Sequence, residues 1–284
     1  MAYDARMKRF DGQGAIVTGG GSGIGRAISK ALVGRGAWVL VTDLDGASAS
    51  RVASELGSSA RAATLDVRDA AAVRALVEGV ASERGRLDLL FNNAGIGVGG
   101  EVQELSVAHW DRIIDINVRG VVHGVQAAYP IMVKQRQGHI VNTASLAGLA
   151  PVPLLVPYAM TKHAVVGLST SLRLEAAAYG VRVSALCPAA IETPLLDCDN
   201  PADLPRVGWR PDVRGYLASL SGKPYPVDKL AEETLDAVAA NRALIVIPGR
   251  ARTIWRLGRS LPGLVERVGL SAVAAQRKAR GAGS

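Results

Sequence analysis

Short apolar runs alternate with helix-forming segments along most of this chain, and this alternation restricts the possible folds more than any other feature. The runs are continuous in apolar residues, as in strands that are buried on both faces. Helices between them would act as the crossovers that join parallel strands. Seven runs are expected to be strands, at residues 14–18, 37–42, 60–65, 87–91, 139–143, 181–186 and 243–247. The sequence therefore predicts a single α/β domain, a doubly wound, Rossmann-like parallel sheet with helices on both faces.

Two helices and one irregular segment complete the expected organisation. A long helical stretch is expected at residues 107–135, and a second helix carries Tyr158 and continues to about residue 179. Residues 189–226 contain six prolines and little periodicity, which predicts a mobile flap. The main domain is expected to span residues 1–248, and residues 249–284 form an extension.

A glycine-rich segment, TGGGSGIG at residues 18–25, joins the first expected strand to the first expected helix. Glycine permits a tight turn and close approach of the backbone to a pyrophosphate, whose charge the helix N-terminus stabilises. The position between strand and helix favours dinucleotide binding over a plain flexible loop. The loop residues expected to contact the cofactor are Gly19, Gly21, Ser22, Gly23, Ile24 and Gly25.

Asp43 follows the glycine loop at the end of the second expected strand. A carboxylate at this position accepts hydrogen bonds from both ribose hydroxyls of an adenosine and repels a 2′-phosphate. The next residue, Leu44, is apolar, and the glycine loop contains no Lys or Arg. The sequence therefore predicts NAD in preference to NADP, with a solvated turn aspartate as the alternative.

Tyr158 and Lys162 lie four residues apart, a spacing that places two side chains on one face of a helix. A free tyrosine has a pKa of about 10 and is a poor base at neutral pH. A fixed cation nearby lowers that pKa, as proton transfer to or from an alcohol requires. Tyr225 and Lys229 have the same spacing, but flanking prolines disfavour a continuous helix there. The first pair also has Ser145 upstream.

In these motifs the chain resembles the short-chain dehydrogenase/reductase family in its basic form, over about residues 10–248. The resemblance rests on motifs whose order and separations match those of the family. They are TGGGSGIG, Asp66-Val67, NNAG at 92–95, Asn117 in NVRG, Ser145 in NTASLAG, YAMTK at 158–162, and Pro188 through Thr193.

The resemblance implies a role for each of four catalytic residues. Tyr158 would be the general acid/base, and Lys162 would lower its pKa and bind the nicotinamide ribose. Ser145 would hydrogen-bond the substrate oxygen, and Asn117 would hold a water in a proton relay from Lys162. Hydride would pass between an alcohol carbon and the nicotinamide while Tyr158 moves the hydroxyl proton. A dinucleotide-sensing protein of the same fold without turnover is the alternative.

The resemblance also implies cofactor contacts outside the glycine loop. They are Asn93, Ala94 and Gly95 on the adenosine side, Asp66 and Val67 at the adenine edge, and Pro188, Ile191 and Thr193 near the nicotinamide. One departure is Ala189, which follows Pro188 where the family usually has glycine. A homo-oligomer, either dimer or tetramer, is expected by analogy, through the helices at 107–135 and 155–179.

Three segments are expected to determine the substrate, at residues 96–100, 146–156 and 189–226. Residues 149–156 are wholly apolar, which favours a hydrophobic alcohol or ketone. Cys187, Cys198 and the four histidines show no metal-ligand spacing, so no metal site is expected. The N-terminus lacks a secretory signal and no run of about 18 apolar residues occurs, so a cytoplasmic protein is expected.

The net charge of +8 comes from the end of the chain. From residue 241 onward there are nine Lys or Arg and one acid, Glu266, so residues 1–240 carry 24 charges of each sign. No basic aromatic surface accompanies this excess, and nucleic-acid binding is therefore disfavoured.

The extension has the pattern of two short amphipathic helices divided at Pro262 and Gly263. Its apolar face carries Ile254, Leu257, Leu261, Leu264, Val265 and Val268, opposite a row of arginines. Such a segment is suited to packing on its own body, on a neighbouring subunit or on an anionic membrane surface. The three possibilities remain open, and residues from Arg277 onward are expected to fray.

Overall fold

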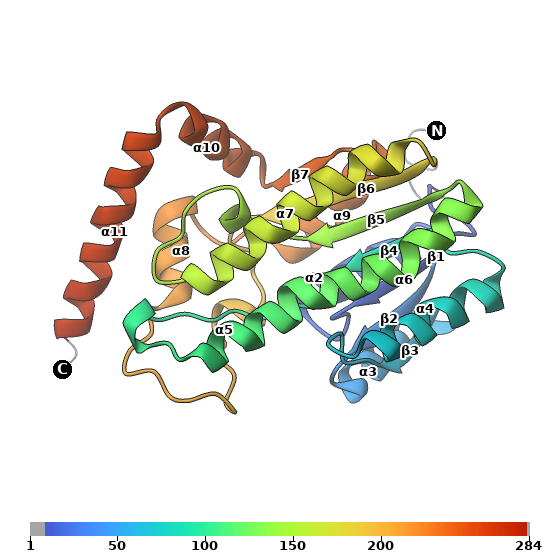
Figure 1. Ribbon diagram of the computed structural model, residues 1–284, viewed down its shortest axis with the longest axis horizontal. Coiled ribbons are helices and arrows are strands. Elements are labelled where there is room, and N and C mark those ends of the chain that lie inside the picture. Colours follow the sequence, from blue (N-terminus) through green and yellow to red (C-terminus); the bar gives the residue numbers. More distant parts are fainter. Residues whose placement is uncertain (1–8, 283–284) are drawn as a thin grey trace.

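Seven parallel strands form the central sheet of the computed structural model, which describes residues 9–282 (Figure 1). Their order is β3-β2-β1-β4-β5-β6-β7, so the direction of winding reverses between β1 and β4. The strands are β1 Gly14–Thr18, β2 Trp38–Asp43, β3 Ala60–Thr64, β4 Leu89–Asn92, β5 Gly138–Thr143, β6 Val181–Pro188 and β7 Leu244–Ile247. All seven predicted strands are present, each within two residues of its predicted bounds, and the doubly wound parallel fold is confirmed.

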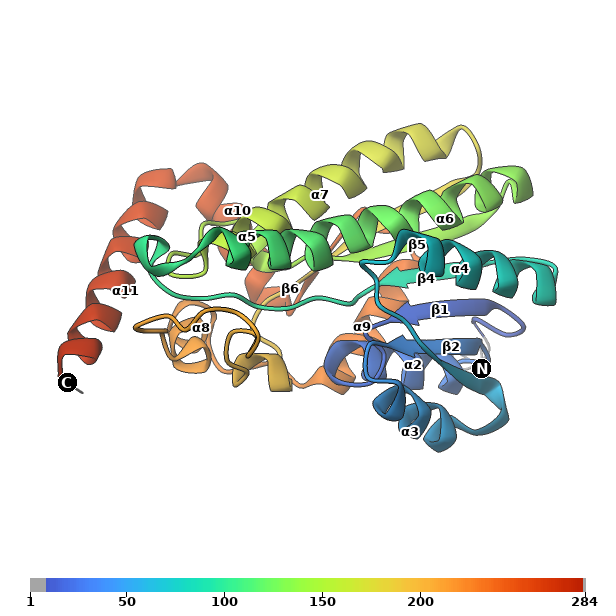
Figure 2. The ribbon, with the colours of Figure 1, turned by 60° about the horizontal axis from the view of Figure 1, so that its bottom comes forward.

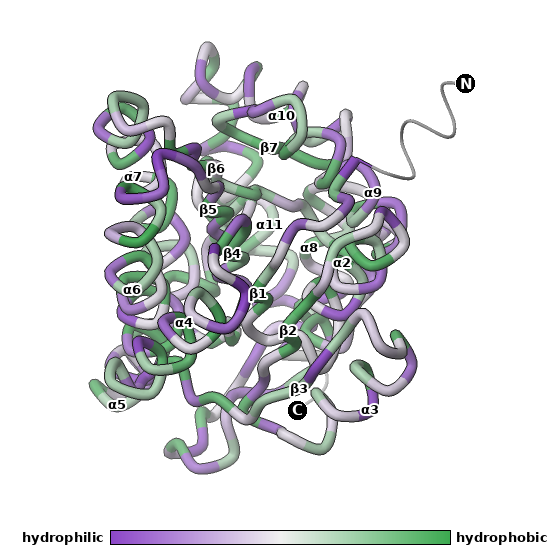
Figure 3. Tube along the Cα trace, turned by 90° about the vertical axis from the view of Figure 1, so that its right-hand side faces the viewer, coloured by the Kyte–Doolittle hydropathy of each residue, from purple (hydrophilic) through white to green (hydrophobic). Residues whose placement is uncertain are grey.

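Helices cover both faces of this sheet (Figures 1 and 3). One layer contains α4 (Ala70–Arg84), α6 (Gly120–Gln135) and α7 (Val156–Ala177). The other contains α2 (Gly23–Gly34), α3 (Gly46–Leu56) and α9 (Val227–Ala239). Successive residues of a strand point to opposite faces, so the continuous apolar strands supply two cores. In β1, for example, Ile16 packs in one core and Val17 in the other.

The long helical stretch predicted at 107–135 is interrupted in the structure. It consists of α5 (Val107–Ile114), a π-helical segment at Asp115–Arg119, and α6. The apolar periodicity continues through the π-helical segment, so it did not reveal the break. Such segments inside helices frequently occur at functional sites.

The flap between β6 and α9 contains a helix that was not predicted, α8 (Val213–Ser221). Asp212 caps its N-terminus, where its Oδ1 accepts a 3.1 Å hydrogen bond from the amide of Gly215. The surrounding prolines concealed this short helix in the sequence. The flap is therefore partly helical.

After β7 the chain forms α10 (Gly249–Ser260) and α11 (Pro262–Ala282), divided next to Pro262, as predicted. Figures 1 and 2 show α11 beside α8, at one end of the molecule. Fraying from Arg277 was wrong for Arg277 and Arg280, which lie within α11 and form ion pairs, whereas residues 283–284 lie outside the described part. Within residues 9–282, no helix is both long and apolar enough to cross a membrane.

Candidate active site

The glycine loop after β1 folds so closely that side chains are excluded from it. Gly19 has a φ of +62°, and a Cβ there would lie 2.8 Å from the Cα of Ala94. A Cβ on Gly25 would lie 2.2 Å from the carbonyl oxygen of Gly19. Ser22 stands at the N-cap of α2 but makes no side-chain cap hydrogen bond. The first amides of α2 are therefore without a side-chain acceptor, as an anion-binding helix terminus requires.

Asp43 lies beside this loop, as predicted. Its Oδ2 accepts a 2.9 Å hydrogen bond from the amide of Gly21, and its Oδ1 accepts one of 3.0 Å from the amide of Asp45. The carboxylate is half-buried, and Leu44 beside it is 64% exposed. The predicted ribose-binding carboxylate and the predicted pyrophosphate loop thus form one continuous surface.

The segment after β4 is fixed against the glycine loop through Thr18. The Thr18 Oγ1 accepts 3.0 Å hydrogen bonds from the amides of both Asn93 and Ala94. The Asn93 Nδ2 in turn donates to the carbonyl oxygens of Thr18 and Gly19, over 3.1 and 3.2 Å. These contacts place Asn93, Ala94 and the adjoining Gly95 at the edge of the loop.

Asp66 and Val67 follow β3 on the same side. The Asp66 carboxylate binds the guanidinium of Arg68, which lowers the pKa of Asp66 below its ordinary value. Val67 is buried, and its carbonyl oxygen lies 2.8 Å from the His123 Nδ1. Asp66 is therefore ionised and held in place by Arg68. The next residue, Val67, is held against α6 through His123.

Tyr158, Lys162 and Ser145 come together at the carboxyl ends of two neighbouring strands. Tyr158 and Lys162 lie one turn apart in α7, and the Lys162 Nζ is 5.6 Å from the centroid of the Tyr158 ring. The buried Lys162 donates a 2.8 Å hydrogen bond to the carbonyl oxygen of Thr143, the last residue of β5. The Ser145 Oγ donates a long hydrogen bond, 3.4 Å, to the carbonyl oxygen of Pro188, the last residue of β6.

Burial governs the protonation of this cluster. It raises the pKa of the Tyr158 hydroxyl above its ordinary value, opposed by a hydrogen bond with Ser145. Burial also lowers the pKa of Lys162 to about 8. The sequence predicted that Lys162 lowers the pKa of Tyr158, whereas in the structure burial of the hydroxyl sets the direction of the shift.

The neighbouring Cys187 thiol is neutral, because burial raises its pKa to about 12. The half-buried Tyr158 therefore has one nearby cation, Lys162, and no thiolate beside it.

Asn117 is completely buried in the π-helical segment. Its Oδ1 accepts a 2.9 Å hydrogen bond from the amide of Ile96, and its Nδ2 donates to the Ile96 carbonyl oxygen over 3.0 Å and to the Thr161 Oγ1 over 3.2 Å. A Cβ on Gly95 would lie 3.2 Å from the Asn117 Oδ1 and 3.5 Å from the Lys162 Nζ. Asn117 thus lies close to Lys162, and the Asn117 side chain fixes the backbone of Ile96.

The helix that carries Tyr158 is also fixed to the sheet farther along. The Asn142 Nδ2 in β5 donates a 3.0 Å hydrogen bond to the Ser169 Oγ of α7, and the Asn142 Oδ1 accepts one of 2.9 Å from the Asn92 Nδ2 in β4. All three side chains are buried. These hydrogen bonds join two strands and α7.

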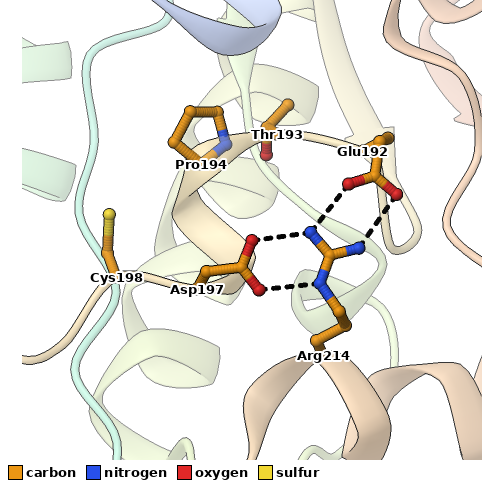
Figure 4. Close-up of a pocket in the computed structure, with 6 residues that line it drawn as sticks. All are labelled: Glu192, Thr193, Pro194, Asp197, Cys198 and Arg214. Carbon is orange, nitrogen blue, oxygen red and sulfur yellow. Dashed lines mark hydrogen bonds and ion pairs between the residues drawn. The ribbon is translucent and has the colours of Figure 1, made fainter.

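The start of the flap, which contains Ile191 and Thr193, returns to the glycine loop. A Cβ on Gly23 would lie 3.3 Å from the Thr193 Cγ2. Beside Thr193, Arg214 of α8 binds both Glu192 and Asp197, as Figure 4 shows. The carboxylates hold α8 against the segment that follows β6.

A cavity of about 610 Å³ opens above Tyr158 and Ser145. Its walls include the predicted cofactor residues Ile24, Pro188, Ile191 and Thr193. They also include the complete apolar face of the extension, Ile254, Leu257, Leu261, Leu264, Val265 and Val268. The amphipathic pattern identified this face from sequence but did not place it at the site.

The predicted residues thus form two adjoining groups. The glycine loop, Asp43, Asp66 and their neighbours lie over the strands on the β1–β3 side, and Asn117, Ser145, Tyr158 and Lys162 lie over β4 to β6. The second Tyr–Lys pair is separate. Tyr225 precedes α9, and its hydroxyl donates a 2.5 Å hydrogen bond to Glu233.

The chain is similar in sequence to known proteins. The family model for short chain dehydrogenase matches residues 13–203. Levodione reductase of Leifsonia aquatica is 38% identical over 213 residues, which cover 70% of this chain and 80% of the reductase. The probable oxidoreductase EphD of Mycobacterium tuberculosis is 34% identical over 87% of this chain, which spans only 43% of the length of EphD.

The chain is also similar to a solved structure. A short chain dehydrogenase/reductase from Burkholderia phymatum, crystallised in complex with NAD, superposes with a TM-score of 0.81 at 34% identity, covering 90% of this chain and 96% of the other. The range matched by the family model includes the glycine loop, Tyr158 and Lys162. The chain belongs to the short-chain dehydrogenase family of oxidoreductases.

Proposed function

We propose that this chain is an NAD-dependent oxidoreductase that interconverts a hydrophobic secondary alcohol and its ketone, with Tyr158 as the general acid/base. One observation carries the proposal. The Tyr158 hydroxyl and Ser145 face the same cavity, while the buried Lys162 approaches from behind and the dinucleotide loop adjoins it. These are the groups that a proton transfer coupled to hydride transfer needs.

Tyr158 and Ser145 have separate roles in this reaction. Nicotinamide, when bound, supplies or accepts the hydride. Tyr158 moves the proton of the substrate hydroxyl, and Ser145 donates a hydrogen bond to the substrate oxygen. The present hydrogen bond of Ser145 to the Pro188 carbonyl is long at 3.4 Å, so exchanging it for a substrate oxygen costs little.

Lys162 supplies positive charge to this proton transfer. With a pKa of about 8 it is mostly protonated at neutral pH, and its charge favours the phenolate of Tyr158. Burial opposes that phenolate.

The preference for NAD rests on Asp43. Its half-buried carboxylate stands beside the glycine loop, where it would accept the ribose hydroxyls and repel a 2′-phosphate. The NAD complex of the Burkholderia protein and the reductase named for levodione support the cofactor and the carbonyl chemistry.

Tyr158→Phe tests the proposal, with Tyr225→Phe as a matched control. Activity is followed at the NADH absorbance band over a panel of secondary alcohols and ketones, and NAD binding by calorimetry. We expect Tyr158→Phe to lower kcat by about 10²–10⁴-fold with NAD affinity retained, because only the proton transfer is lost. Tyr225→Phe should retain kcat. NAD binding without turnover of any panel member by the wild type would instead support a dinucleotide sensor.

We further propose a homo-oligomer assembled through α5, α6 and α7. Val107 on α5 is 72% exposed and Leu174 on α7 is 79% exposed, so both helices present large apolar side chains to their surroundings. Sedimentation of the wild type and of Leu174→Glu tests this. A monomeric wild type would contradict the proposal, and dissociation by Leu174→Glu would support it.

A further inference from the structure

The extension forms one wall of the cavity that contains Tyr158 and Ser145. The extension contributes eleven of the residues that line it, five from α10, five from α11 and Leu261 between them, whereas the flap helix α8 contributes four. The cavity volume of about 610 Å³ falls within the range of about 300–1,000 Å³ that is typical of sites for drug-sized ligands. The family model ends at residue 203, so this wall lies outside the part of the chain that the model matches.

The apolar side chains of this wall are exposed to the cavity. Leu257 is 56% exposed, and Leu261 and Leu264 are each 49% exposed, although all three line the same space as Tyr158. Contiguous apolar surface of this kind marks a place where a partner or ligand binds. Because the opposite wall is also apolar, with Leu149, Val152 and other residues, an apolar occupant would cover both walls.

Ion pairs hold the far end of α11 against the body. The Arg277 Nε lies 2.6 Å from the Glu101 Oε1, and Arg280 lies 2.9 Å from the Glu104 Oε1. The Arg280 guanidinium is also 5.4 Å from the centroid of the Trp209 ring in the flap. Arg277 lowers the pKa of Glu101 below its ordinary value, so this pair is ionised at neutral pH.

The ion pairs favour an extension that forms a wall of the cavity over one that binds a membrane surface. Two of the basic side chains that would contact anionic lipid are engaged by carboxylates of the same chain. The apolar face points to the catalytic side chains, and Leu270, which is 65% exposed, lies outside the cavity on the same helix.

The charged groups of the cavity wall are few. Among residues 9–282, no acidic side chain lines the cavity. Of its two cations, Arg210 pairs with Asp199 at 3.3 Å and Arg259 lies 5.8 Å from the Trp255 ring centroid. The walls therefore suit an uncharged, largely hydrocarbon ligand.

We infer that the substrate is a large apolar secondary alcohol or ketone whose hydrocarbon portion lies along Leu257, Leu261 and Leu264 of the extension. The reacting oxygen lies at Ser145 and Tyr158, so the inference rests on the function proposed above. The extension then determines substrate specificity. A large substrate buries the apolar surface of the extension, which a small alcohol would leave exposed to water.

Two homologous series test this: 2-alkanols from 2-butanol to 2-decanol, and cyclohexanols carrying a 4-alkyl group of rising length. We expect kcat/KM to rise by up to about fourfold for each methylene group that becomes buried. Leu264→Gln should reduce the ratio of kcat/KM for the longest to the shortest member by about tenfold. Leu270→Gln is the matched control, because it changes the same residue type on the same helix outside the cavity.

Binding of the corresponding ketones, measured by calorimetry with NAD present, separates the two proposals. Length-dependent binding that Leu264→Gln weakens, without turnover, would support the apolar ligand and contradict the oxidoreductase. Turnover without dependence on length, or equal effects of Leu264→Gln and Leu270→Gln, would contradict the inference and leave the oxidoreductase standing. A change of sedimentation coefficient with Leu264→Gln, at unchanged selectivity, would show instead that this face joins two copies of the chain.

Discussion

Lys162 donates its hydrogen bond to the carbonyl oxygen of Thr143, 2.8 Å away, so the last residue of β5 positions the ammonium beside Tyr158. The lysine is 4% exposed, and this burial lowers its pKa from 10.5 to about 8. A group whose pKa is lower in the folded protein is proton-poor there between those two values. The unfolded chain then binds more protons, and the stability of the protein rises with pH across that interval.

Replacing Lys162 by Met should therefore stabilise the protein at pH 7 while abolishing turnover. Burying the charged ammonium costs at most about 3–4 kcal/mol, at about 1.4 kcal/mol per pH unit of the shift. Loss of the hydrogen bond to Thr143 offsets about 1 kcal/mol of this gain. We expect a gain of roughly 2 kcal/mol in the free energy of unfolding at pH 7, shrinking between pH 8 and pH 10.5. Denaturant titrations of both proteins across this range measure it, and a difference independent of pH would contradict the assignment.

Removing the Asp43 carboxylate should admit NADP. We expect Asp43→Ser with Leu44→Arg to raise the ratio of kcat/KM for NADP to that for NAD by roughly 100-fold. This is within the limit of about 4 kcal/mol for two unit charges some 4 Å apart in a partly screened site. Asp45→Asn is the control, since it removes a nearby carboxylate but keeps a residue able to cap α3. An unchanged cofactor ratio in the double variant would refute the role of Asp43.

Loss of the Asn117 side chain should destabilise the segment after β4. Asn117→Ala leaves the amide and carbonyl of Ile96 without their partners, at a cost of roughly 2–4 kcal/mol and a drop in Tm of about 5–10 °C. Thr161→Val removes one of the Asn117 hydrogen bonds and the bond from the Thr161 hydroxyl to the Tyr158 carbonyl oxygen, and should cost about 1–2 kcal/mol. Thermal unfolding compares the two variants; equal Tm values would argue against the proposed role of the pair of bonds to Ile96.

Salt should weaken the attachment of α11. The Arg277 side chain is 59% exposed, and the Debye length falls to about 3 Å at 1 M salt, so its pair with Glu101 is screened. We expect high salt to reduce the preference for long substrates, and Glu101→Gln to show at low salt the selectivity that the wild type has at high salt. Glu55→Gln breaks an exposed pair with Arg26, and it serves as the control because neither residue lines the cavity. Selectivity that is insensitive to both salt and Glu101→Gln would count against this attachment.

The sequence was sufficient for the sheet because a strand buried on both faces needs a continuous apolar run, which is visible residue by residue. The glycine loop, Asp43 and the Tyr158–Lys162 spacing were found for a similar reason, since each depends on neighbours along one element. The π-helical segment around Asn117 was missed because the apolar periodicity continues through it, and the bonds of Asn117 to Ile96, a residue of a different segment, are not visible in the sequence.

Two features required the three-dimensional arrangement. The pKa of Tyr158 depends on how many atoms from distant segments exclude water from it, and spacing along a helix carries no information on that. The amphipathic face of the extension predicted that something covers Leu257 and Leu264, but the surface opposite them is set by where β7 ends.

The buried hydrogen bonds from Asn92 through Asn142 to Ser169 have a consequence for how such an enzyme can change. Ser169 lies seven residues beyond Lys162 in α7, about 10 Å along the helix axis. These hydrogen bonds fix α7 to the interior of the sheet. They involve neither the flap nor α10 and α11, so the end of α7 that carries Tyr158 is held independently of those segments. Insertions or replacements in those outer segments can alter the choice of substrate without displacing the reaction chemistry, so substrate range and catalysis are free to evolve, or to be engineered, separately.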